Sequence, residues 1–406
     1  MHADTPRTIR TRHRLAAAAL MLLASVALAA PTRAQARMEF IPSVSLFTVY
    51  DDNLFARATG SAGQMLQLRP SFEGSYESPT LRLLGLYTFD MQRSNFSSLN
   101  TLDARRHALG DIRLRTSPMT TLAVAMRYDR SETPGEVSPT GILGERRQAE
   151  RLQLTPTFER RLNRRTTMNA AYDWTTEHLI EGPQGTLHVG RTSLAREVTP
   201  RTTLSGGYVG RLFVDDLADH SSHTALFGWS RAMAPGTRLS FSAGPKFTTY
   251  RGLTPEVSAA FLRDTPRVRL ALDYWHGETI VLGIRGPVAV DGVTSRITWP
   301  LTRTIEFGTH LGVSDVTTLD DMDTTVYRGT LVGSWSPGGI YTVATSYGLD
   351  FQQGDIRDRL WLDGQQQLVD DQVLRHVFRV SVTIAPRYSR SILPPDEAAR
   401  AKGVSR

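Results

Sequence analysis

An alternation with a period of two is the feature that most constrains the fold, and it runs over residues 41–384. Between residues 121 and 130, apolar side chains occupy every second position, and polar or small side chains occupy the others. Such a period places successive side chains on opposite sides of a β-strand, whereas a helix would scatter them around its circumference. No stretch shows a sustained helical period. The sequence therefore predicts an all-β fold.

Two kinds of connection alternate between the predicted strands. One kind is short and contains proline, as in Ser117-Pro118-Met119 and Ala234-Pro235-Gly236, because proline presets the backbone of a tight turn. The other kind is longer and acidic, and it covers residues 51–63, 131–145, 215–222, 315–323 and 352–372. Short turns at one rim and long loops at the other are typical of a transmembrane up-and-down antiparallel β-barrel.

The alternation gives about 18 strands, and counts of about 14 or 16 are also compatible with it. Residues 275–299 are the least defined interval. The predicted strands start near Ile41, Gln64, Leu81, Ala104, Thr121, Arg147, Thr166, Thr186, Thr202, His223, Thr237, Val257, Val268, Val288, Thr304, Thr324, Ile340 and Val373.

The first 36 residues have the organisation of a secretory signal peptide. Four arginines lie between Arg7 and Arg14, an apolar run covers residues 15–30, and Ala34-Gln35-Ala36 supplies the small residues of a cleavage site. We expect cleavage after Ala36. A retained anchoring helix is the alternative, although the run is shorter than the about 20 residues that span a bilayer. The chain has no cysteine, which excludes a lipidated cysteine anchor and disulfide bonds.

The basic surplus of the chain does not indicate nucleic-acid binding. The formal net charge is +7, but residues 1–36 contribute +4 of it, with five arginines against Asp4. The other 42 basic and 39 acidic residues leave +3 and are dispersed. Nucleic-acid surfaces usually gather Lys and Arg on one face, so we expect no nucleic-acid partner.

A large secreted β-sandwich, β-helix or propeller is the alternative to a membrane barrel. The polar face of the strands carries Arg and acids with no sign of a second dry core, so the apolar face is predicted to contact lipid. The expected partners are then outer-membrane lipid, lipopolysaccharide and the barrel assembly machinery. Aromatic residues near strand ends are expected to form an interfacial girdle, namely Tyr50, Tyr76, Tyr128, Trp174, Tyr208, Tyr250, Tyr274, Trp299, Trp335 and Tyr347.

The lumen of such a barrel would be rich in cations. The predicted lumen cations are Arg69, Arg82, Arg113, Arg115, Arg127, Arg151, Arg211, Arg238, Lys246, Arg269, Arg375 and Arg379. A cationic wall favours anions and binds the carboxylate or phosphate groups of a polymer, so anion or acidic-glycan preference is one hypothesis. The alternative is that these cations pair with acids on neighbouring strands and brace the wall. Residues 131–145 and 352–372 are long enough to fold inward and narrow the lumen.

Signals of catalysis are weak. Asp215, Asp216 and His220 share one predicted loop and could act as an acid and base pair, but similar Asp pairs recur in other loops. The sequence has no metal-ligand spacing, no phosphate-binding glycine loop and no nucleophile elbow. We therefore expect no enzymatic activity, cofactor or metal site.

The first predicted strand carries one recognisable motif, Tyr50-Asp51-Asp52-Asn53. With its flanking residues 42–55, it resembles the start of an outer-membrane β-barrel porin family associated with exopolysaccharide and exosortase gene clusters. The resemblance in pattern extends over residues 40–386. It implies an outer-membrane conduit for polysaccharide export, partnered by a periplasmic polysaccharide export protein. The alternative is a general diffusion porin or a structural outer-membrane protein.

The expected division of the chain is a signal peptide at 1–36, a barrel at 37–386 and a periplasmic tail at 387–406. Many barrels end on a terminal aromatic residue that the assembly machinery reads. Here the last strand is predicted to end near Ile384, so the insertion signal is expected within residues 376–384.

Overall fold

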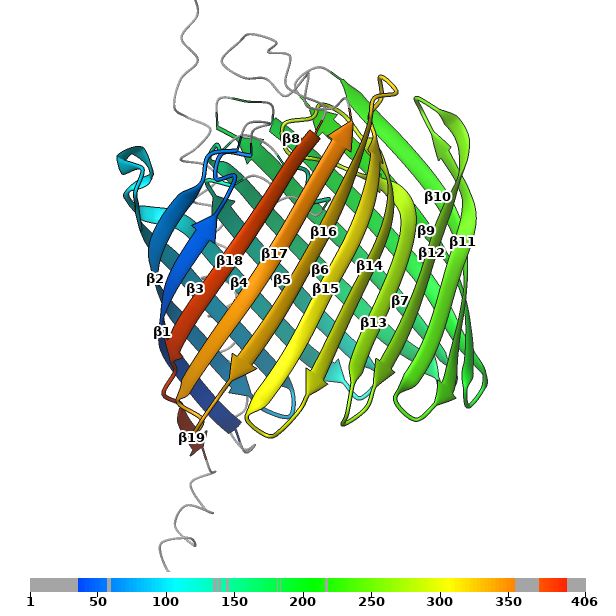
Figure 1. The fold of residues 1–406 in the computed structure, drawn as a ribbon. Coiled ribbons are helices and arrows are strands. Elements are labelled where there is room, and N and C mark those ends of the chain that lie inside the picture. The colour runs from blue at the N-terminus through cyan, green and yellow to red at the C-terminus, as the bar shows by residue number, and fades with distance from the viewer. Residues whose placement is uncertain are drawn as a thin grey trace, which may run out of the picture.

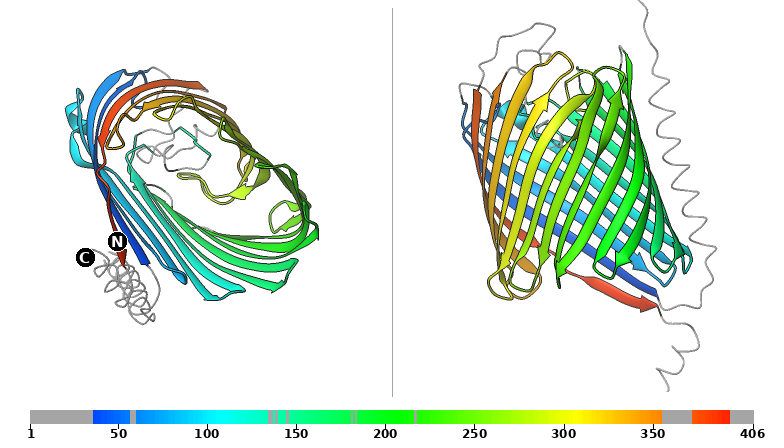
Figure 2. Two further views of the ribbon diagram at one scale, coloured as in Figure 1. Left: turned by 90° about the horizontal axis from the view of Figure 1, so that it is seen from below. Right: turned by 90° about the vertical axis from the view of Figure 1, so that its right-hand side faces the viewer.

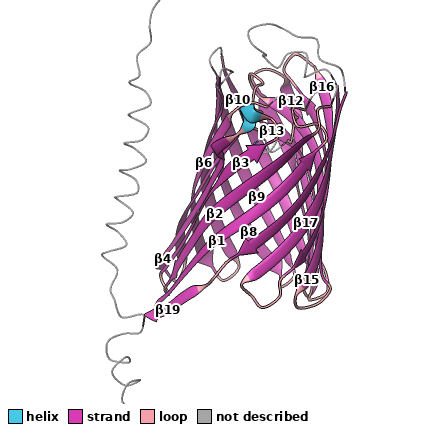
Figure 3. Ribbon diagram, turned by 60° about the vertical axis from the view of Figure 1, so that its left-hand side comes forward, coloured by secondary structure: helices cyan, strands magenta, loops and turns pink. Residues whose placement is uncertain are grey.

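The computed structural model describes residues 36–56, 60–133, 137, 140–143, 146–180, 182, 184–215, 218–354 and 372–392. Nearly all of these residues lie in strands, and the short 3₁₀-helix η1 (Ser97–Leu99) lies close to one rim (Figure 3). Within these ranges, no helix combines the length and the hydropathy that crossing a membrane requires.

Eighteen long antiparallel strands form a closed wall, which Figure 1 shows from the side. Each strand pairs with the next, and β18 pairs with β1 from Val44↔Ile384 to Asp51↔Val377, which closes the sheet. The predicted antiparallel barrel of about 18 strands is confirmed. The strands are β1 (Ala36–Asp51), β2 (Gly63–Glu77), β3 (Leu81–Ser94), β4 (Thr101–Ser117), β5 (Thr120–Ser131), β6 (Ala149–Asn163), β7 (Thr166–Leu179), β8 (Gln184–Thr199), β9 (Thr202–Asp215), β10 (Asp219–Ala234), β11 (Thr237–Thr248), β12 (Gly252–Asp264), β13 (Arg269–Thr279), β14 (Val288–Pro300), β15 (Ile305–Thr317), β16 (Asp323–Trp335), β17 (Tyr341–Gly354) and β18 (Gln372–Ile384).

The two faces of the wall differ in polarity. On β1, Val44, Leu46 and Tyr50 are exposed on the outside, whereas Val49 and Asp51 on the other face are buried. The same division recurs around the ring, because the exposed side chains of the outer face are largely Leu, Val, Phe and Tyr. A closed sheet with an apolar exterior satisfies its backbone hydrogen bonds internally and can lie in hydrocarbon. The chain is therefore an outer-membrane β-barrel, and the soluble alternatives are wrong.

The two rims differ as the sequence predicts. Short turns such as 118–119, 200–201 and 235–236 join strands at the lower rim in Figure 1, and the longer connections lie at the upper rim. We take the upper rim as extracellular, because long loops face outward in this class of barrel. The predicted loop at 215–222 is wrong in extent, because β9 and β10 continue the ladder up to Asp215 and Asp219. The predicted inward fold of residues 352–372 falls mainly on residues outside the described ranges.

One connection does not stay at the rim. Between β13 and β14, residues 280–287 carry the side chains of Ile280, Val281 and Leu282 into buried positions inside the barrel. Figure 2 (left), which looks along the barrel, shows chain lying within the ring of strands. We call residues 280–287 the plug loop. It explains why the alternation was least defined in this interval.

A nineteenth strand extends the seam. On one edge, β1 pairs with β18 over residues 44–51 and with β19 (Tyr388–Ile392) over residues 36–40. The sheet thus continues past Pro386, into the segment expected to be a tail. Ala36 is the first residue of β1, and Ala34 lies outside the described residues, so cleavage after Ala36 stays a prediction.

Candidate functional site

Most of the predicted lumen cations form ion pairs. Each pair joins residues of the inner face. Two pairs lie within one strand, three join neighbouring strands and three join strands that are two or three positions apart, so the bracing role that the sequence left open applies to this subset. The eight pairs are Arg69–Asp90, Arg113–Asp111, Arg127–Asp129, Arg151–Glu177, Arg211–Glu256, Lys246–Glu278, Arg269–Glu306 and Arg375–Asp51.

The other four predicted cations divide into two groups. Arg82, Arg115 and Arg238 are exposed and lie within two residues of the lower ends of β3, β4 and β11. They lie at the periplasmic mouth. Arg379 lies on β18 inside the barrel. For all four, the described part of the chain provides no carboxylate within 4.0 Å.

Arginines converge in one chamber of the lumen. This cavity of 310 Å³ lies between β1–β5 and β15–β18, and it is lined by Arg105, Arg146, Arg328, Arg375 and Arg379 together with Asp90 and Asp350. Asp51 and Glu132 lie beside this lining and pair with Arg375 and Arg146, and Arg69 pairs with Asp90. Six guanidinium groups are therefore matched by four carboxylates. We call this cavity the arginine chamber.

The two aspartates of the chamber each hold more than one arginine. Asp90 accepts two hydrogen bonds from Arg69, at 2.6 and 2.7 Å, and its carboxylate also lies 3.9 Å from Arg105. Asp350 accepts a hydrogen bond from Arg328 Nε at 2.9 Å, and it lies 3.9 Å from Arg375. One carboxylate shared between two guanidiniums leaves a positive excess, which a bound anion can neutralise.

Among the arginines that line the chamber, Arg379 is the one with no carboxylate within 4.0 Å in the described ranges. Its guanidinium lies 5.9 Å from the centre of the Phe47 ring, and Arg69 lies over the same ring at 4.6 Å. Its Nε is buried and has no hydrogen-bond partner within the described ranges. A buried donor without a partner costs free energy that a ligand oxygen would recover.

Arg146 enters the chamber from the β5–β6 connection rather than from the wall. Its Nη2 lies 3.3 Å from Glu132 and from the Gln92 side-chain oxygen. Burial lowers the pKa of Arg146, and the nearby Glu132 carboxylate opposes that shift. Of the connection 131–145, the described residues Ile142 and Leu143 turn inward, because both are buried and the Leu143 N–H donates to the Gln352 side-chain oxygen.

Arg105, Arg146 and Arg328 were missed by the sequence reasoning. Arg105 and Arg328 continue the inner parity of β4 and β16, since Arg105 shares a face with Arg113, and Arg328 shares one with the buried Val326. That signal was present in the sequence. Arg146 precedes a strand, so no alternation could place it.

The motif Tyr50-Asp51-Asp52-Asn53 closes the barrel. Asp51 is fully buried and accepts hydrogen bonds from Arg375 Nε at 3.1 Å and Nη2 at 2.6 Å. Asp52 accepts from the His376 N–H at 2.6 Å, and the Asn53 side chain donates to the Leu374 carbonyl at 3.0 Å. Tyr50 faces outward. Three consecutive polar side chains therefore join the first strand to the last one by hydrogen bonds at the upper end of the seam.

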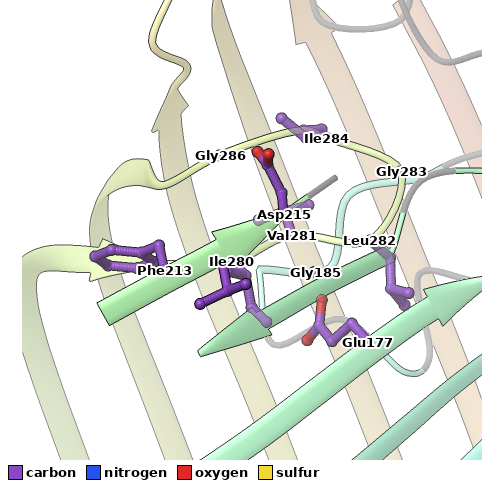
Figure 4. A pocket seen from close by; sticks show the side chains of 11 residues that line it. Glu177, Gly185, Phe213, Asp215, Ile280, Val281, Leu282, Gly283, Ile284 and Gly286 are labelled. Carbon is purple, nitrogen blue, oxygen red and sulfur yellow. The ribbon is translucent and has the colours of Figure 1, made fainter. Parts of the chain in front are cut away.

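The plug loop packs between two apolar patches of the inner wall. On one side, Ile280 belongs to an apolar cluster with Leu187, Val189, Val209 and Phe213 of β8 and β9. On the other side, Val281 packs against inner-face side chains of β14–β16 and against the β5–β6 connection, namely Val288, Val290, Val316, Val326 and Ile142. Figure 4 shows the loop above Phe213 and Glu177. The plug loop covers these apolar side chains, which explains why they occur on the inner face of a barrel with a polar lumen. It also narrows the upper part of the barrel.

The residues considered for catalysis make other contacts where the structure describes them. His220 contacts the Tyr250 ring edge-on, and Asp215 accepts the Ala218 N–H at 2.8 Å, while Asp216 lies outside the described residues. The described ranges contain no group of three or more His, Cys, Asp or Glu side chains that could hold a metal ion. Tyr250, expected in the girdle, instead buries its hydroxyl. Burial and the neighbouring Glu278 raise the pKa of Tyr250.

Comparison with known proteins finds likeness among solved structures alone. No protein-family description matches the chain, and no curated protein matches it. Pseudomonas aeruginosa OccK7 (OpdD) aligns over 88% of this chain and 100% of its own, with 11% identity and a TM-score of 0.48. Acinetobacter baumannii OccAB4 aligns over 86% and 98%, with 8% identity and a TM-score of 0.45. The siderophore receptor PirA from P. aeruginosa aligns over 88% and 81%, with 9% identity and a TM-score of 0.40. The assignment to the outer-membrane barrels rests on the strand pairing and the apolar exterior of the chain itself.

Proposed function

We propose that the protein is the outer-membrane conduit through which an anionic exopolysaccharide leaves the cell. The observation that carries this proposal is the arginine chamber, where six guanidinium groups in and beside the lining outnumber the four carboxylates that pair with them. Guanidinium groups bind carboxylate and phosphate through paired hydrogen bonds, and acidic polysaccharides carry such groups along their length. The resemblance of the first strand to barrels of exopolysaccharide clusters supports the same substrate class.

The periplasmic side offers an entry for such a polymer. Arg82, Arg115 and Arg238 lie at the lower mouth, and the lumen leads from them to the arginine chamber. We propose that a periplasmic polysaccharide export protein docks at this rim, and that the barrel assembly machinery inserts the barrel. The connection between β5 and β6 reaches the chamber, since Arg146 lines it and the Gly141 carbonyl accepts a hydrogen bond from Arg328.

Diffusion of small anions is the second candidate function. The chamber volume of 310 Å³ lies at the lower end of the about 300–1,000 Å³ typical of small-molecule pockets, which fits a single sugar acid better than a chain. A structural role without transport is the remaining alternative.

Charge selectivity tests the role of the chamber. In planar bilayers under a salt gradient, the wild-type protein is expected to favour anions, because cations outnumber acids along the path. The double variant Arg105→Gln/Arg379→Gln is expected to lose most of that preference, which a shift of the reversal potential towards zero would show. Arg93→Gln is the matched control, since Arg93 lies opposite the exposed Leu66 on the outer face. Cation preference in the wild type would overturn the proposal.

Export is tested by deleting the gene and assaying polysaccharide on the cell surface. Surface polysaccharide is expected to be lost and to return with the wild-type gene, but only partly with Arg105→Gln/Arg379→Gln at equal barrel abundance. Unchanged export in the deletion strain would refute the export function. Anion selectivity combined with unchanged export would favour diffusion of small anions.

A further inference from the structure

Tyrosine and histidine side chains form a repeated pair on the outer surface. In three hairpins, a tyrosine hydroxyl lies 2.6–2.7 Å from the Nδ1 atom of a histidine on the next strand. The tyrosine always lies seven residues before the end of the ascending strand, and the histidine lies four residues after the start of the descending one. The pairs are Tyr172–His188, Tyr208–His223 and Tyr347–His376.

Two of these pairs lie side by side. Tyr172–His188 joins β7 to β8, and Tyr208–His223 joins β9 to β10. On β9, His188 faces Leu212 and His223 faces Gly210, which are neighbouring positions of the same face. Two strand spacings separate the imidazoles laterally by about 10 Å. A single lipid headgroup can therefore reach both.

Two arginines below the pairs indicate where the pairs lie relative to the apolar band of the membrane. Arg196 and Arg231 lie on the same outer face, eight residues further down β8 and β10. The outer positions between are small or apolar, and they include the exposed Leu194 and Phe227. Eight residues of tilted strand rise by about 20 Å, and the apolar band of such barrels is about 25 Å tall. The imidazoles therefore lie at the extracellular edge of the band, where lipid headgroups begin.

The chemistry of the pairs suits an anionic headgroup. The tyrosine hydroxyl occupies Nδ1, so that Nε2 can donate to a group outside the barrel. At His376, by contrast, the Asp52 carboxylate lies 3.9 Å from Nε2 and competes with any anion. The pairs on β7–β10 are the open ones, and the apolar strip beneath them can contact acyl chains.

We propose that Tyr172, His188, Tyr208 and His223 form a docking surface for the phosphate groups of lipopolysaccharide in the outer leaflet. The surface faces away from the lumen, so this inference is independent of the transported substrate. It assigns a place on the barrel to a lipid that the outer membrane provides.

Thermal unfolding in defined vesicles tests the surface. The protein is reconstituted in phosphatidylcholine vesicles that contain either bisphosphorylated lipid A or lipid A stripped of phosphate, and the conversion of folded to unfolded barrel is followed by gel mobility after heating. The phosphorylated lipid is expected to raise the unfolding temperature of the wild type by several degrees, and the stripped lipid by much less. His188→Gln/His223→Gln is expected to lose most of this gain. The lumenal variant His310→Gln, which changes a histidine inside the barrel, is expected to keep it.

Three outcomes would overturn the proposal. These are an undiminished gain in His188→Gln/His223→Gln, an equal gain from stripped lipid A, and an equal gain from inorganic phosphate added to plain vesicles, which would indicate an ion site. If the double histidine variant fails to insert, Tyr172→Phe/Tyr208→Phe keeps both rings and removes the hydroxyls that orient the imidazoles. That variant is expected to lose part of the gain, and a full gain would equally contradict the docking surface.

Discussion

Serine at positions 280, 281 and 282 is expected to release the plug loop and to raise single-channel conductance severalfold. In the wild type, Ile280, Val281 and Leu282 are 3–6% exposed and belong to three different apolar clusters. Burying one aliphatic side chain contributes about 1.5–3 kcal/mol, so the three together hold the loop with roughly 5–9 kcal/mol. Serine removes most of that free energy. The docked loop should then become the minor state, which conductance in planar bilayers would measure.

The control for this variant is Leu301→Ser. Leu301 is exposed in the turn at the other end of β14, so the same kind of change there is expected to leave conductance unchanged. Trypsin cleavage after Arg285 would report release of the loop independently of conductance. Faster cleavage without any rise in conductance would show that the plug loop does not restrict the lumen.

Asp51→Ala is expected to produce the largest loss of stability among single substitutions in the wall. It leaves the buried Arg375 guanidinium without its two-point partner, and breaking a buried ion pair in this way costs about 3–5 kcal/mol. Asp350, 3.9 Å from Arg375, offsets a small part. The seam between β1 and β18 should therefore open at a lower temperature, which gel mobility after heating would detect.

Two further variants distinguish the cost of an unpaired buried charge from the cost of losing any ion pair. Asp51→Ala/Arg375→Met removes both charges and is expected to regain much of the lost stability, because no uncompensated cation remains. Asp111→Ala breaks the exposed pair with Arg113 and is expected to cost at most about 1 kcal/mol. Equal losses in Asp51→Ala and Asp111→Ala would contradict the closing role of the motif.

The alternation of the sequence was sufficient to predict the wall of the barrel. Predicted starts at Leu81, Thr202 and Thr237 coincide with the observed ones, because a proline turn precedes each of them at one rim and the two faces of the strands have opposite polarity. Register within each hairpin follows from the short turns. These are local properties, so a single sequence contains them.

The arginine chamber was not predictable to the same extent. Its lining comes from β1–β5 and from β15–β18, which meet because β18 closes onto β1. The alternation along β18 predicted that Arg375 and Arg379 face the lumen, but it could not show that they lie near Arg105. Convergence of this kind depends on closure over more than 300 residues of chain, which no local pattern encodes.

The plug loop was missed for a different physical reason. An apolar run between two strands resembles strand continuation, and the period of two is lost there. A signal was nevertheless available, because Leu187, Val189, Val288 and Val290 are apolar on the parity that elsewhere is polar. Apolar residues on the wet face of a barrel indicate that something covers them.

The short strand β19 gives the order of synthesis a structural meaning. Residues 36–40 of β1 are among the first of the barrel to be made, yet their partners at 388–392 are among the last. A chain stopped after Ile384 would have every strand of the wall and still present five residues of unpaired backbone at the periplasmic surface. Such an edge can recruit a strand from another chain. Completing the last residues of the sheet thus protects the newly inserted barrel from its neighbours.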